Sequence, residues 1–131
     1  MVAVDKNETT NKQIYKGENK MRDFKAAMIV VMARTNINRK DLQFPLVYSS
    51  IFGKTSVREL DLTERAKNVL GRNGISTMKD LMDSFDRIER FRSCGKQTVR
   101  EIKNQFLQRW YETITDDECT KFWEEFIIMN A

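Results

Sequence analysis

The stretch ELDLTERAKNVLGRNGISTMKDL, residues 59–81, decides the fold of this protein. Thr63 can cap a helix that runs to about Asn73, because a threonine hydroxyl can accept a hydrogen bond from an amide of the first helical turn. Two glycines surround the end of that helix, where a left-handed conformation costs glycine little. Thr77 then begins a near capping box that opens another helix. The stretch therefore predicts two short helices joined by a glycine turn.

Apolar residues at three- and four-residue spacing predict further helices on both sides of this stretch. Met21 to Arg34 is nearly apolar all round, so it needs a cover from this chain or another. Asp86 can cap one turn that reaches Phe91. Gly95 precedes a longer helix with the stripe Val99, Ile102, Phe106 and Trp110. A last helix opens with a capping box and carries Cys119, Phe122, Trp123, Phe126 and Ile127 on one side.

The segment between the first two helical regions is predicted to be irregular. Pro45 forbids a regular helix there, and Gly53 marks a turn. Its apolar side chains are expected to pack as an extended strap: Leu46, Val47, Tyr48, Ile51 and Phe52. No run alternates between polar and apolar residues, so the predicted fold class is all-α, a compact bundle of short helices.

Composition changes along the sequence indicate four regions. Residues 1–20 are polar and predicted to be a disordered tail. Residues 21–55 hold the first helix and the strap, 56–110 the bundle of short helices, and 111–131 an acidic helix. The two flanking helices could complete the core of the small central domain, or one of them could be a dimer or partner surface.

The composition of the 131-residue protein argues against an enzyme. It has no histidine, which removes a histidine base and a histidine-ligated metal, and its five glycines form no phosphate-binding loop. Cys94 and Cys119 cannot make a four-ligand zinc site, so no cofactor or metal is expected. No signal peptide is recognised, which favours reduced thiols and a cytoplasmic location. The apolar run from Ala26 to Ala33 is too short for a membrane span.

Charge is unevenly distributed around the formal net value of +4. Residues 1–109 carry 22 basic and 13 acidic side chains, whereas residues 110–131 carry one and six. The basic body suggests a polyanionic partner, most simply nucleic acid, although solubility explains a modest excess equally well. The acidic end could also fold back on the basic body and weaken it as a phosphate-binding surface.

Two segments share the plan of a helix, a tight glycine turn and a second helix: residues 69–77 and 91–98. Backbone amides at the start of a helix can hold a phosphate oxygen, aided by the helix dipole. Arg72 adds positive charge beside the first turn and Lys96 beside the second. Such units can grip a nucleic-acid backbone without reading bases. The plain alternative is that both turns are only connectors.

Three motifs in this order resemble the C-terminal domain of the bacterial RNA polymerase alpha subunit. That family reads E-L-(D/E)-L-(S/T)-V-R-S-x-N-C-L, similar to residues 59–70, and G-I-x-T-x-x-(D/E)-L, similar to residues 74–81. It closes with N-L-G-(R/K)-K-S-L-x-E-(I/V)-K, similar to residues 93–103. The resemblance covers about residues 56–107. It implies a compact domain of four to five helices with two helix-hairpin-helix-like elements, here in a stand-alone relative.

The resemblance also implies a binding site for double-stranded DNA. Domains of this family bind the minor groove of A/T-rich DNA and meet transcription factors. Arg65 matches the main groove-inserting arginine and Asn68 a second groove residue; both lie on one helical face. The last turn corresponds to Gly95, Lys96, Gln97 and Thr98.

Several residues depart from the family pattern. Gln97 replaces a lysine, which removes about one phosphate contact. Glu64 replaces a valine and could repel DNA or hold the Arg65 guanidinium aside. Ser93 replaces an asparagine, and Lys67 adds a charge that partly offsets these losses. Cys94 occupies a leucine position and is expected in the core.

Three hypotheses follow. The first is a non-enzymatic DNA-binding protein of transcription or its regulation, acting through Arg65, Asn68 and the Gly95 turn. The second is a protein-interaction module that mimics the polymerase domain to bind RNA polymerase, a sigma factor or a transcription factor. The third is an accessory protein of DNA ends or repair with generic backbone contacts. The sequence indicates no oligomeric state.

Overall fold

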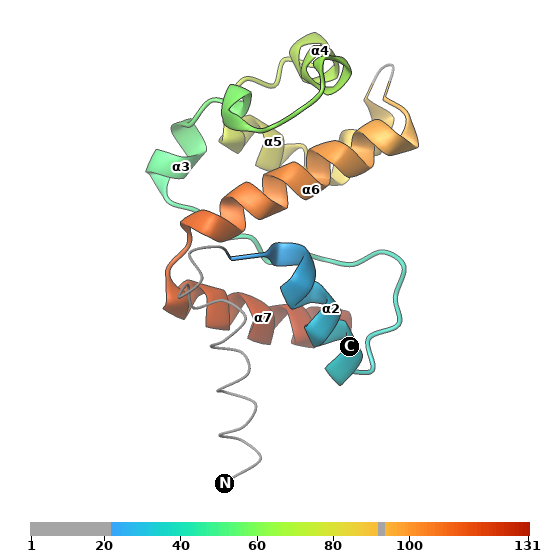
Figure 1. Cartoon of the computed structure of the whole chain (residues 1–131), viewed down its shortest axis with the longest axis vertical. Coiled ribbons are helices and arrows are strands. Elements are labelled where there is room, and N and C mark those ends of the chain that lie inside the picture. The colour runs from blue at the N-terminus through green and yellow to red at the C-terminus, as the bar shows by residue number, and fades with distance from the viewer. Residues whose placement is uncertain (1–21, 92–93) are drawn as a thin grey trace, which may run out of the picture. The chain divides into compact units, whose positions relative to one another are not determined.

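The computed structural model describes residues 22–91 and 94–131, so the predicted tail and Ser93 lie outside the described residues. Within these ranges the structure is helical and contains no β-strand, only an isolated antiparallel bridge between Ser56 and Thr77. The predicted all-α fold class is confirmed. The protein divides into two compact units, one of residues 48–110 and one that joins residues 22–47 to 111–131 (Figure 1).

The unit of residues 48–110 is built from short helices. Its α-helices are α3 (Ser50–Lys54), α4 (Glu64–Arg72), α5 (Met78–Asp83) and most of α6 (Lys96–Thr113), and its 3₁₀ helices are η2 (Val57–Glu59) and η3 (Phe85–Arg90). Phe106 of α6 lies at the centre of the core. Its ring centroid is 5.9 Å from that of Phe52 and 5.6 Å from that of Phe85.

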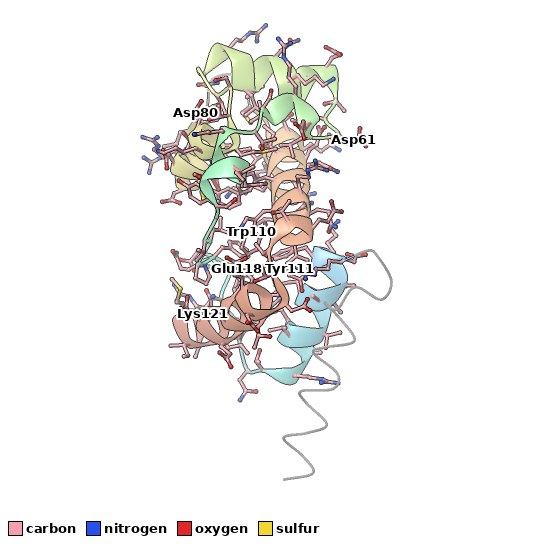
Figure 2. The ribbon with its side chains drawn as sticks, turned by 90° about the vertical axis from the view of Figure 1, so that its left-hand side faces the viewer. Asp61, Asp80, Trp110, Tyr111, Glu118 and Lys121 are labelled. Atoms are coloured by element: carbon pink, nitrogen blue, oxygen red, sulfur yellow. The ribbon has the colours of Figure 1, made fainter. Side chains whose placement is uncertain are left out.

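The ends of α4 and α5 follow their caps. The Thr63 hydroxyl accepts a hydrogen bond from the Ala66 amide at 3.3 Å, as predicted. Thr77 and Asp80, the latter labelled in Figure 2, form a reciprocal capping box with both hydrogen bonds at 3.1 Å. The amides of Ser76 and Thr77 lower the pKa of the Asp80 carboxyl, because they stabilise its charged form.

Of the two glycines near the end of α4, only one has a backbone conformation that favours glycine. Gly74 has φ +74°, whereas Gly71 lies inside the helix, and a Cβ at either position would meet nothing within 4 Å. We expect Gly74→Ala to lower the free energy of unfolding by about 1 kcal/mol, through backbone strain alone. Gly71→Ala should raise it by up to about 1 kcal/mol, because alanine favours helix. Urea unfolding checks the pair, and equal effects of the two changes would contradict this account.

The predicted strap is wrong in part. Ser49 caps α3 by accepting a hydrogen bond from the Phe52 amide at 3.1 Å, so a short helix replaces extended backbone. Gly53 belongs to that helix rather than to a turn, and a Cβ there would lie 2.8 Å from the Tyr48 ring. Val47 and Ile51 are 55% and 80% exposed instead of packed.

Three smaller expectations also need correction. Asp86 caps nothing, because η3 begins at Phe85 directly after Ser84, the residue that ends α5. Cys94 is half-buried rather than in the core. Val99, expected to face inward, is also half-buried.

The second unit contains α2 (Phe24–Arg34) and α7 (Asp116–Asn130). The Phe24 ring stacks on Trp123, with centroids 5.5 Å apart, and meets Tyr111 edge-on at 5.3 Å. The capping box at the start of α7 is confirmed. Thus α2 and α7 pack in a unit of their own, with Ile29 of α2 left 69% exposed.

Polar side chains inside this unit are satisfied by one another. The Tyr111 hydroxyl accepts a hydrogen bond from the Trp123 indole at 2.9 Å and lies 3.3 Å from the Cys119 sulfur. Burial raises the pKa of Cys119 to about 11 and that of Tyr111 well above its usual range. Both groups are therefore uncharged at neutral pH. None of the helices in the described part of the protein is long and apolar enough to cross a membrane.

Candidate nucleic-acid interface

The outward face of α4 carries three of the predicted site residues. Arg65, Asn68 and Arg72 follow one another at spacings of three and four residues, so they share one side of the helix. All three are exposed, whereas Ala66, Val69 and Leu70 of the same helix are buried. No hydrogen bond or ion pair with any residue that the structure describes occupies the two guanidinium groups.

The start of α4 is tied to α6 by one carboxylate. The Thr63 amide donates to Glu101 Oε2 at 2.6 Å, and the Thr63 hydroxyl donates to Glu101 Oε1 at 2.9 Å. Because Thr63 precedes the first turn of α4 and Glu101 lies in the second turn of α6, both helix starts lie at the same end of the unit (Figure 1). The sequence suggested no role for Glu101.

The charge of Arg65 reaches the turn before α6. Partial burial raises the pKa of the Cys94 thiol, and the Arg65 guanidinium acts in the opposite direction. Cys94 directly precedes Gly95. The electrostatic effect of Arg65 on Cys94 and the Thr63–Glu101 hydrogen bonds therefore both indicate that the start of α4 lies near the Gly95 turn. The structure brings Arg65 and the Gly95 turn together, as the DNA-binding hypothesis requires.

The first turn of α6 offers amides and one cation. The Val99 amide donates to the Gly95 carbonyl at 3.0 Å, so the amides of residues 96–98 have no partner within the helix. Gly95, Lys96 and Gln97 are exposed. Thr98 is only 6% exposed, so its side chain is not open to a ligand.

The added charge of Lys67 is partly compensated within α4. Its ammonium group lies 3.7 Å from the Glu64 carboxylate, and both side chains are exposed. The sequence predicted that Glu64 could repel DNA or hold the Arg65 guanidinium aside. Because Glu64 pairs with Lys67 instead, the structure does not show the second effect. Glu64 instead contributes negative charge near the stripe of α4, which is formed by Arg65, Asn68 and Arg72.

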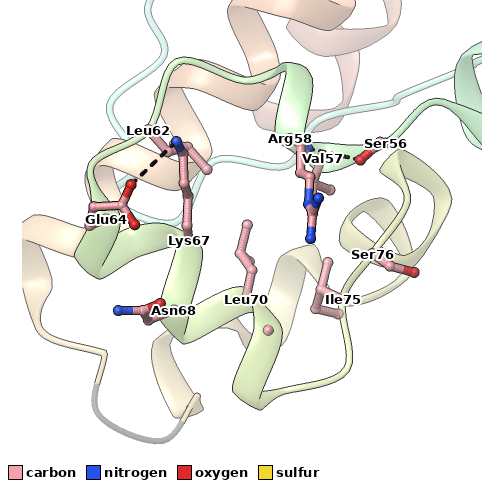
Figure 3. Close-up of a pocket in the computed structure, with 11 residues that line it drawn as sticks. Ser56, Val57, Arg58, Leu62, Glu64, Lys67, Asn68, Leu70, Ile75 and Ser76 are labelled. Atoms are coloured by element: carbon pink, nitrogen blue, oxygen red, sulfur yellow. Dashed lines mark hydrogen bonds and ion pairs between the residues drawn. The ribbon is translucent and has the colours of Figure 1, made fainter.

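Sequence reasoning missed Arg58, which lies on η2 beside an open hollow of about 560 Å³ (Figure 3). Ser56 caps this 3₁₀ turn by accepting a hydrogen bond from the Arg58 amide at 3.1 Å. The only local sign of this turn in the sequence was Ser56, a residue type that can cap a helical turn, two positions before Arg58. Among the described residues, no group of three histidine, cysteine, aspartate or glutamate side chains is placed to hold a metal ion.

Fold and site together define a small all-helical domain that presents two helix starts and a glycine turn at one end. Residues 50–108 match the family model for the C-terminal domain of the bacterial RNA polymerase alpha subunit. This part of the protein is therefore an alpha C-terminal-domain-like domain, and the resemblance seen in the sequence is confirmed.

Curated relatives agree with the family match. The DNA-directed RNA polymerase subunit alpha of Mycoplasmoides gallisepticum is 44% identical over 57 residues, which are 43% of this protein and 17% of that subunit. The alpha subunit of Mesoplasma florum is 31% identical over 78 residues, 59% of this protein and 21% of the subunit. The matched residues thus span about a fifth of the length of these relatives. No solved structure gives a significant match.

Proposed function

We propose that the domain binds double-stranded DNA in transcription or its regulation. Arg65 and Asn68 enter the minor groove of A/T-rich DNA, while the first turn of α6 holds phosphates of the backbone. The observation that carries this proposal is the Thr63–Glu101 connection, which sets the stripe of α4 beside the Gly95 turn.

The electrostatics favour this arrangement. A narrow A-tract groove concentrates negative potential, so an inserted guanidinium is stabilised there. Arg65 and Arg72 are free of internal ion pairs among the described residues, so no such pair has to break when DNA binds. Lys96 and the amides beside it supply phosphate contacts that do not depend on base sequence.

Amide NMR shifts during titration with an A/T-rich duplex test the proposal. The resonances of Arg65, Gly95 and Lys96 are expected to move together at low salt. Equal affinity for A/T-rich and G/C-rich duplexes would point instead to generic backbone contacts, as in a DNA-end or repair accessory. An absence of shifts at these residues would contradict DNA binding through this face.

Glu64→Gln is expected to strengthen duplex binding about two- to fivefold, because it removes a negative charge near the groove and releases Lys67 for phosphate. Asp83→Asn is the matched control. Asp83 pairs with Lys79 at 2.7 Å on α5, so this change alters the net charge equally elsewhere in the unit. Fluorescence anisotropy measures both, and an equal gain in the control would show a general charge effect.

A second candidate function is binding to RNA polymerase, a sigma factor or a transcription factor. The exposed side of α2 favours it, because Ile29 is 69% exposed and Ala26 and Ala33 lie near it on the same side. Capture of purified RNA polymerase without a detectable duplex shift at low salt would support this function over DNA binding.

A further inference from the structure

The hollow beside α4 is lined by Asn68 but not by Arg65. Its lining joins polar side chains to the largely buried apolar residues Leu62, Leu70 and Ile75. Arg58 and Lys67 stand on opposite sides of the opening, with Leu70 between them (Figure 3). Among the described residues, no hydrogen bond or ion pair engages the Arg58 guanidinium.

The helix α4 forms a ridge that separates the hollow from the Gly95 turn. Lys67 follows Arg65 by two residues, so it is rotated by about 200° around the helix. Arg65 does not line the hollow, and the start of its helix is tied to α6 through Thr63 and Glu101, whereas Lys67 lines the hollow. Asn68 lies between these two directions on the ridge.

A minor groove is bordered by two sugar-phosphate backbones, one on each side of whatever enters it. If the Arg65 and Asn68 side chains of α4 enter the groove, the Gly95 turn meets one backbone and the hollow meets the other. The hollow suits that occupant, because the phosphate presents an anion to the cations Arg58 and Lys67 at its rim. Since Glu64 partly compensates Lys67, Arg58 supplies the cation that has no ion pair among the described residues, in a planar form that binds two phosphate oxygens.

We propose that this hollow receives the backbone of the second DNA strand and that Arg58 binds its phosphate. The inference rests on the proposed DNA binding and adds to it a second point of contact across the groove. It assigns to Arg58 a role in affinity and in dependence on salt, but not in the choice of bases.

Arg58→Ala in the full-length protein tests the inference, with Lys54→Ala as the matched control. Both side chains are exposed, each change removes one positive charge, and Lys54 ends α3 outside the hollow. We expect Arg58→Ala to weaken duplex binding about fivefold and to reduce the slope of log affinity against log salt by about one. Lys54→Ala should weaken binding less than about twofold. Arg58→Lys should recover part of the loss.

The outcomes separate this inference from the proposed function. If Arg65→Ala weakens binding but Arg58→Ala only equals Lys54→Ala, the hollow is not a strand site although the domain binds DNA. If Arg65→Ala has no effect, the proposed function fails and the ridge argument fails with it. If an acidic peptide shifts the amides of Ile75 and Ser76 while a duplex does not, the hollow is a peptide site and the inference is wrong.

Discussion

Arg65→Ala is expected to weaken binding of an A/T-rich duplex by about 10- to 100-fold, the loss typical of one specific groove contact. The guanidinium is exposed at the start of α4 and has no ion pair among the described residues, so alanine removes a DNA contact without breaking an internal one. The preference for A/T-rich over G/C-rich DNA should fall as well, because it depends on the potential of the narrow groove.

Two further variants sharpen this measurement. Arg65→Lys keeps the charge but not the planar fork, so it should recover the salt dependence better than the affinity. Lys54→Ala removes one charge elsewhere in the same unit. Titrations at several salt concentrations check all three variants. If Arg65→Ala and Lys54→Ala had the same affinity and salt slope, Arg65 would be an ordinary solvated arginine.

Asn130→Ala is expected to lower the free energy of unfolding of the second unit by about 2–4 kcal/mol. The side chain is fully buried. It accepts a hydrogen bond from the Gln43 amide at 2.7 Å and donates to the carbonyls of Gln43 at 2.9 Å and Phe126 at 2.8 Å. Alanine leaves these backbone groups unsatisfied and creates a void beside the segment that follows α2.

The control lies two residues earlier on the same helix. Ile128 is 76% exposed, so Ile128→Ala should change the free energy by less than about 0.5 kcal/mol. Urea unfolding followed by tryptophan fluorescence, to which Trp123 of this unit and Trp110 of the other both contribute, measures both changes. Similar effects of the two changes would show that Asn130 does not hold the segment around Gln43. No residue of the proposed DNA interface lies in this unit, so duplex affinity of the folded variant should be unchanged.

The helix ends that the sequence predicted correctly depend on neighbours within a few residues. Thr63, Thr77 and Thr115 each accept a hydrogen bond from an amide three residues ahead, so their caps are legible in the sequence alone. Ser49 obeys the same rule. It was missed because Pro45 and Gly53 suggested an irregular segment, whereas Gly53 lies inside α3 with the Tyr48 ring packed close to it.

The residues that assemble the candidate site depend on neighbours far along the sequence. Thr63 meets Glu101 across 38 positions, and Gln43 meets Asn130 across 87. The side that Arg58 faces depends on where η2 packs relative to α4. The sequence by itself determined the helices, their caps and the face that Arg65 shares with Asn68, because these follow from local hydrogen bonds and the helical repeat. Only the tertiary structure decided which helix starts meet, which cations stay unpaired and where the hollow lies, because those properties arise from contacts between segments whose separation in sequence carries no local signal.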